Sequence, residues 1–132
     1  MKPEFERAAI SGDVLALETL LGAGTDIDAR DRYGQTALML AAHHGRLQAV
    51  ETLLRHGANP DVTAKFNLSA LMLAIVARHE AVAGALLRAG TDLEHRGTGA
   101  PGFWNKTAYD LAVDRGMAAL CAEIMKAKET HA

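Results

Sequence analysis

Five residues stand out by type and spacing as candidates for chemistry: His43, His44, Cys121, Asp110 and Asp114. Adjacent histidines could bind a metal ion, a thiol could act as a nucleophile, and two carboxylates could share acid–base work. Adjacent positions of a helix point about 100° apart, however, and no HExxH or CxxC spacing accompanies the histidines. We therefore interpret His43 and His44 as solvated surface residues and predict no metal site.

A repeat of 33 residues determines where these side chains lie. The segment GDVLALETLLGAGTDID, from Gly12, matches GRLQAVETLLRHGANPD, from Gly45, and a further shift of 33 brings Gly57 onto Gly90. The segment TALMLAA, from Thr36, returns as SALMLAI after the same interval. A fixed period of this length is typical of stacked repeat proteins.

A fourth copy follows after an insertion of five residues. The segment TAYDLAVDRG, from Thr107, aligns with TALMLAAHHG, from Thr36, at a shift of 71 rather than 66. The extra residues fall within 97–102, where glycine and proline predict a loop. The chain is therefore expected to be one domain with approximate repeats 1–30, 31–63, 64–96 and 97–132.

Each copy predicts two helices joined by a tight turn. In the second copy, the hydroxyl of Thr36 can cap the first helix, and Gly45 can end it in a left-handed conformation. Val50, Leu53 and Leu54 then form an apolar stripe at helical spacing. One helix pair cannot bury its own apolar face, so neighbouring copies must stack into an all-α solenoid.

The pattern TALMLAAHHG followed by LLRHGANPD resembles the ankyrin repeat, and the resemblance covers essentially the whole chain in four copies. It implies helix–turn–helix units linked by β-hairpin-like loops, with the first and last copies acting as caps. The chain departs from the family pattern at the proline position (Ala37, Ala70, Ala108), the histidine position (Met39, Met72) and the glycine positions (Asn67, Arg78, Asn105). Asparagine is the best substitute for glycine in a left-handed conformation, so two of these changes are conservative.

The repeat also assigns the remaining reactive groups to structural positions. Cys121 aligns with Val50, an apolar helix position, and is interpreted as a small buried hydrophobe. Asp110 aligns with Met39, and Asp114 is interpreted as a solvated groove residue. Because neither a phosphate-binding glycine loop nor a nucleophile elbow occurs, we predict that the protein is not an enzyme and needs no cofactor.

Aromatic residues gather at one position of the repeat. The chain has three phenylalanines, two tyrosines and one tryptophan. Tyr33, Phe66 and Trp104 share the third repeat position, near the hairpin tip, and Phe103 precedes the last of them. Rings of this kind anchor protein interfaces, so we interpret them as a binding surface. The alternative is that the rings pack on neighbouring hairpins and rigidify the tips.

The resemblance implies a variable face, formed by the hairpin positions and by the two positions before the mid-repeat glycine. The predicted partner-binding residues are Arg32, Tyr33, Gln35, His43, His44, Lys65, Phe66, Leu68, Val76, Phe103, Trp104, Lys106, Asp114 and Arg115, accompanied by Ile10, Ser11 and Ala77 at equivalent positions.

Composition limits the classes of partner and compartment. The chain carries 14 basic and 16 acidic residues, interspersed along the sequence, and this balance argues against a nucleic-acid partner. A single cysteine excludes an internal disulfide and is compatible with a reducing compartment. The N-terminus does not resemble a secretory signal, and no apolar run is long enough to span a membrane. We expect a cytoplasmic protein.

These observations predict a module that binds another protein and acts as an adaptor or inhibitor, as a monomer rather than a homo-oligomer. Two alternatives stay open. One is self-association through Tyr33, Phe66, Phe103 and Trp104. The other is a small-ligand or metal-dependent enzyme that uses the histidines and aspartates.

Overall fold

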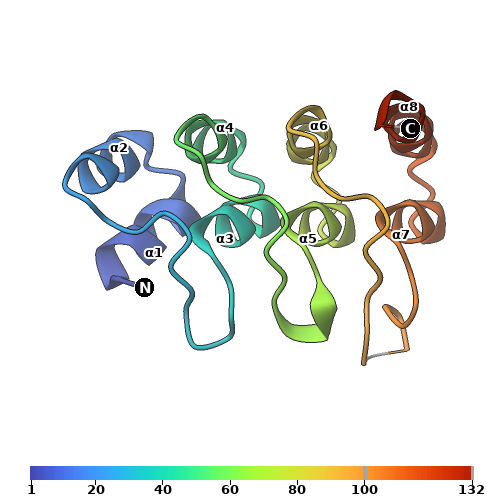
Figure 1. The fold of residues 1–132 in the computed structure, drawn as a ribbon, viewed down its shortest axis with the longest axis horizontal. Helices are drawn as coiled ribbons and strands as arrows, with labels where there is room; N and C mark the ends of the chain where they lie inside the picture. Colours follow the sequence, from blue (N-terminus) through green and yellow to red (C-terminus); the bar gives the residue numbers. More distant parts are fainter. Residues whose placement is uncertain (100, 132) are drawn as a thin grey trace.

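The computed structural model describes residues 1–99 and 101–131, which form two rows of helices that lie side by side (Figure 1). The two helices of each copy run antiparallel, one in each row. These residues form eight α-helices, one short 3₁₀ helix (η1) and no strand. The elements are α1 (Pro3–Ser11), α2 (Val14–Gly22), α3 (Ala37–His43), α4 (Leu47–Arg55), η1 (Lys65–Asn67), α5 (Ala70–Val76), α6 (Glu80–Arg88), α7 (Ala108–Asp114) and α8 (Ala118–His131). The predicted all-α class is confirmed.

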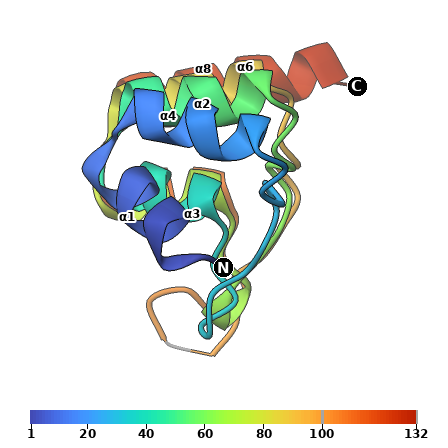
Figure 2. The same cartoon turned by 90° about the vertical axis from the view of Figure 1, so that its left-hand side faces the viewer.

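The stacking of the helices makes the fold a solenoid. Helices α1, α3, α5 and α7 form the first row, and α2, α4, α6 and α8 form the second (Figure 1). Helix α3, for example, contacts α1 and α5 within its row and α4 in the other row. Seen along the stack, the loops that join successive pairs all extend beyond the first row on the same side (Figure 2). This arrangement leaves the second row as the outer face.

The first helix of three copies begins at a buried hydroxyl. Thr36, Ser69 and Thr107 each accept a hydrogen bond from the backbone N–H three residues later, at 3.3 Å. This confirms the predicted cap at Thr36 and repeats it. At Thr107 the cap is reciprocal, because Asp110 accepts from the Thr107 N–H at 3.0 Å. The sequence interpretation missed this role of Asp110.

Left-handed backbone occurs where the repeat predicted it. Gly45 has φ 71°, and the glycine-position residues Asn67, Arg78 and Asn105 have φ 58°, 64° and 58°. Phe66 is also left-handed, with φ 63°, although no sequence signal indicated it. A bulky residue adopts this conformation only when its surroundings hold it there.

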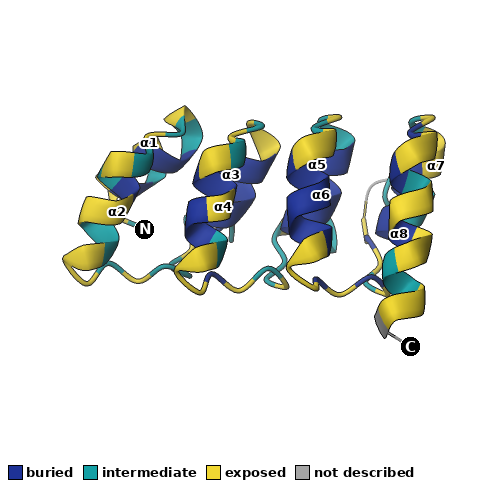
Figure 3. Cartoon of the chain, turned by 90° about the horizontal axis from the view of Figure 1, so that it is seen from above, coloured by how far each residue is buried: buried dark blue, intermediate teal, exposed yellow. Residues whose placement is uncertain are grey.

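The core lies between the two rows and between successive copies (Figure 3). Val50 is completely buried, whereas Cys121, at the equivalent position, is only partly buried. Tyr109 is also only partly buried, whereas Leu38, at the equivalent position of the second copy, is buried. Helices α7 and α8 end the stack and have neighbours on one side, which explains both differences. No helix in the described part of the chain has the length and apolarity needed to cross a bilayer.

Candidate protein-binding surface

Three hairpin loops join the successive helix pairs. Each is closed by a backbone hydrogen bond of 2.9–3.0 Å, and the closing pairs are Asp31–Gln35, Ala64–Leu68 and Gly97–Lys106. The third loop is therefore five residues longer than the other two. Within its insertion, 97–102, Ala100 lies outside the described residues.

The long third loop is attached to the second loop. The Thr98 N–H donates to the Phe66 carbonyl at 2.8 Å, and the Asn67 side-chain amide donates to the Arg96 carbonyl at 2.8 Å. The rings of Phe66 and Phe103 pack with centroids 5.7 Å apart and planes inclined at 43°. Both rings are partly buried against the core. These two rings therefore stiffen the hairpin tips, as the alternative interpretation proposed.

The other two hairpin rings remain accessible. Tyr33 is 58 % exposed and Trp104 is 64 % exposed. The Arg32 guanidinium lies 5.1 Å from the centre of the Tyr33 ring, close enough for a cation–π contact. Tyr33 and Arg32 also line a hollow of about 310 Å³ beside Met1 and Glu6. The hairpin rings thus divide into an internal pair and an exposed pair.

The turns between the two helices of a copy form the other edge of this surface. The Arg46 Nε donates to the Ile10 carbonyl at 2.8 Å, and the His79 Nε2 lies 3.1 Å from the His43 carbonyl. Arg46 and His79 occupy equivalent positions of successive copies, and each side chain contacts a carbonyl of the copy before its own. These contacts satisfy carbonyls at the C-terminal ends of α1 and α3, which have no partner within the helix. The sequence interpretation missed them, although the 33-residue spacing of the two donors was visible.

His43 and His44 are exposed, and their ring centres lie 5.4 Å apart. Partial burial of the His43 ring lowers its pKa below the ordinary value, and the nearby charges of His44 and His79 lower it further. The His44 Nδ1 lies 2.8 Å from the Leu40 carbonyl. The described residues hold no group of three or more His, Cys, Asp or Glu side chains placed to bind a metal ion.

The prediction that Leu68 lies on the surface is wrong. Leu68 is 5 % exposed and belongs to the core, because the backbone that follows η1 turns its side chain inward beside the cap at Ser69. Among the other predicted residues of the third copy, Lys65 is exposed, and Phe66 and Val76 are partly buried. In the last copy, Lys106 forms an ion pair with Asp114.

We use the term binding surface for the three hairpin loops, the mid-repeat turns and the side of the first helix row between them.

A family model that describes three copies of the ankyrin repeat matches residues 5–96. The chain belongs to the ankyrin repeat family. It is also similar to two curated proteins of Rickettsia felis that are named as ankyrin repeat proteins. Each is 47 % identical over 45 residues, which is 34 % of this chain and 71 % or 68 % of the relative.

Ankyrin repeats are general protein–protein interaction modules.

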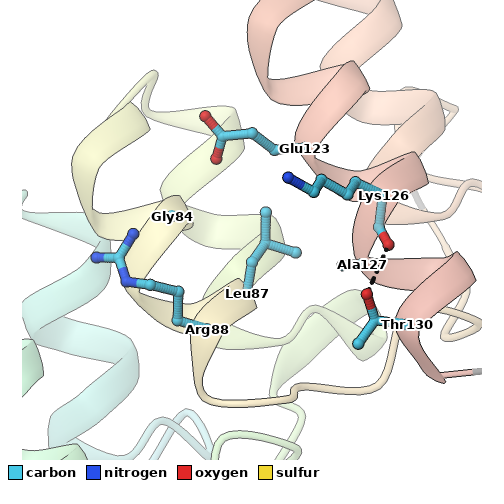
Figure 4. A pocket seen from close by; sticks show the side chains of 7 residues that line it. All are labelled: Gly84, Leu87, Arg88, Glu123, Lys126, Ala127 and Thr130. Atoms are coloured by element: carbon cyan, nitrogen blue, oxygen red, sulfur yellow. Dashed lines mark hydrogen bonds between the residues drawn. The ribbon is translucent and has the colours of Figure 1, made fainter.

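In this ankyrin repeat protein a second hollow, of about 320 Å³, lies on the outer face between α6 and α8 (Figure 4). Gly84 leaves the space open, and the side chains of Arg88, Glu123 and Lys126 surround it. Its lining combines both signs of charge with the apolar Leu87.

Proposed function

We propose that this ankyrin repeat protein binds another protein through its binding surface and acts as an adaptor or inhibitor. The observation that carries the proposal is the exposure of Tyr33 and Trp104 on the first and the third of the three hairpin loops. Large rings with few rotatable bonds bury much area at low entropic expense, which makes them common interface anchors. Both rings would contact a partner that lies across all three loops.

The rigidity of the loops supports the same proposal. The Phe66–Phe103 contact and the backbone bond from Thr98 hold the long loop against its neighbour before any partner arrives. A surface ordered in advance loses less conformational entropy on binding. The action on a partner would then be steric and reversible.

The proposal is tested by affinity capture from native lysate with the wild-type protein and the Tyr33→Ala/Trp104→Ala variant. Circular dichroism checks that both proteins are folded. We expect a partner that the wild type recovers and the variant loses. Recovery of the same partner by both proteins would place binding elsewhere.

Light scattering on the purified protein separates this function from self-association. Self-association through the same rings would give a mass that rises with concentration in the wild type. In the Tyr33→Ala/Trp104→Ala variant the mass would then be lower at the same concentration. We expect a mass that stays at the monomer value over the accessible concentrations, because Phe66 and Phe103 already pack against each other within one chain.

A further inference from the structure

Charge is divided between the two faces of this protein, although the residues are interspersed along the sequence. The hairpin loops (29–36, 62–69, 95–107) and the mid-repeat turns (10–13, 43–46, 76–79, 114–117) contain eight basic and three acidic residues. The basic residues are Arg30, Arg32, Arg46, Lys65, Arg78, Arg96, Lys106 and Arg115. The second helices and the segments after them (14–28, 47–61, 80–94, 118–131) contain four basic and ten acidic residues.

The basic residues form two rows. One row lies in the hairpin loops, where the first helices begin, and the other lies in the turns, where those helices end. Between the rows, α3 and α5 carry no Asp, Glu, Lys or Arg. At the ends of the row, α1 carries Glu4, Glu6 and Arg7, and α7 carries Asp110. A largely apolar strip therefore runs along the two middle copies, with positive charge on both sides.

Most of these cations have no carboxylate partner. The structure records two ion pairs among the described residues, Lys106–Asp114 and Lys128–Glu94, and only the first involves a basic residue of the binding surface. The acidic residues Asp13 and Asp31 accept backbone N–H groups of their own segments. The positive charge of the surface is thus left largely uncompensated.

Backbone carbonyls hold several guanidinium groups in place. Arg30 donates to the Thr63 carbonyl at 3.1 Å, and Arg78 donates to the Arg115 carbonyl at 2.9 Å. Arg96 donates to the Asn105 carbonyl at 2.8 Å, and Arg46 donates to the Ile10 carbonyl at the same distance. A carbonyl does not neutralise the cation, and it leaves other N–H groups of the guanidinium free to donate. The side chains are therefore positioned in advance for carboxylates, which guanidinium groups bind well.

We propose that the partner presents an acidic protein segment, rich in Asp and Glu, to the strip between the two basic rows. This inference rests on the proposed function and adds the chemistry of the partner. A nucleic acid fits less well, because its unbroken row of phosphates is best matched by an unbroken row of cations, whereas Asp13, Asp31 and Asp114 interrupt the basic residues of this surface.

The test uses fluorescently labelled poly-L-glutamate as the acidic probe and fluorescence anisotropy as the readout. We expect wild-type binding in about 50 mM salt that weakens strongly in about 300 mM salt, because salt screens exposed charges. The Arg32→Glu/Lys65→Glu variant should bind about tenfold more weakly. The matched control, Arg55→Glu/Arg88→Glu, makes the same change in net charge on the outer face and should bind within about twofold of wild type.

Three outcomes would overturn the inference. They are no binding of poly-L-glutamate in low salt, an equal loss in both charge-reversal variants, and tighter binding of labelled duplex DNA than of poly-L-glutamate. The proposed function is judged separately. A captured partner that is lost with Tyr33→Ala/Trp104→Ala but retained with Arg32→Glu/Lys65→Glu would keep the binding function and reject the acidic segment.

Discussion

The ring of Phe103 packs on the ring of Phe66, and this contact joins the long third hairpin loop to the second. It also separates two residues that are adjacent in the sequence. Phe103 is directed into the molecule, whereas Trp104, the next residue, is 64 % exposed. The two substitutions therefore have different expected effects.

Phe103→Ala should lower the free energy of unfolding by about 1 to 2 kcal/mol, because it removes a partly buried ring and an aromatic pair. Trp104→Ala should change it by less than about 0.5 kcal/mol, since the ring is mostly in water. Urea denaturation measures both, and hydrogen exchange should show faster exchange in 97–106 for Phe103→Ala alone. Equal losses in the two variants would contradict the division of the rings.

Gly45 allows the side chain of the next copy to approach its backbone. It has φ 71°, and a Cβ atom there would lie 2.7 Å from the His79 ring. Gly45→Ala should therefore combine backbone strain with displacement of the ring from the His43 carbonyl, a loss of about 2 to 3 kcal/mol in thermal or urea unfolding.

Gly57→Ala is the matched control for Gly45→Ala. Gly57 has φ 89° but nothing within 4 Å of the added methyl group. Its loss should be confined to backbone strain, about 1 kcal/mol. If both variants lose the same free energy, the contact between copies at His79 does not contribute.

The hydroxyl of Thr107 takes part in a reciprocal cap with Asp110. Thr107→Val keeps the shape of the side chain and removes the acceptor, so it should destabilise the protein by about 1 to 2 kcal/mol. Thr19→Val, in an exposed position of α2, is the control and should change stability by less than about 0.5 kcal/mol. Chemical denaturation that finds the two variants equal would show that the cap adds nothing.

The lowered pKa of His43 makes stability depend on pH. The unfolded chain titrates near 6.5 at this residue, so below that pH it binds more protons than the folded chain does. The free energy of unfolding should then rise as the pH rises from the folded-state pKa toward 6.5 and fall on acidification. His43→Gln should show a smaller loss of Tm between pH 7 and about pH 5.5 than wild type, with His56→Gln as the matched control. An unchanged slope in His43→Gln would contradict this.

Local chemistry explains what could be predicted from the sequence. The cap at Thr36, the left-handed Gly45 and the asparagines at glycine positions each depend on a residue and its immediate neighbours. The 33-residue period adds the stacking of copies, because the same apolar positions return in each. Together they are enough for the fold.

Contacts between distant residues explain what could not be predicted. The left-handed Phe66, its pairing with Phe103 and the burial of Leu68 depend on how an inserted loop folds on its neighbour. Charge shows the same limit. Basic and acidic residues are interspersed along the chain, and the folding of the repeats brings eight of the basic residues to the hairpin and turn side.

The central claim is that a partner protein contacts the exposed hairpin rings. Its most direct test is the Kd of the captured partner for purified wild type, Tyr33→Ala/Trp104→Ala and Leu15→Ala. The Leu15→Ala control removes an apolar side chain from the outer face that is even more exposed than the two rings. We predict that the ring variant weakens binding at least about tenfold and that Leu15→Ala stays within about twofold. A Kd unchanged by loss of both rings, or weakened more by Leu15→Ala, would contradict the claim.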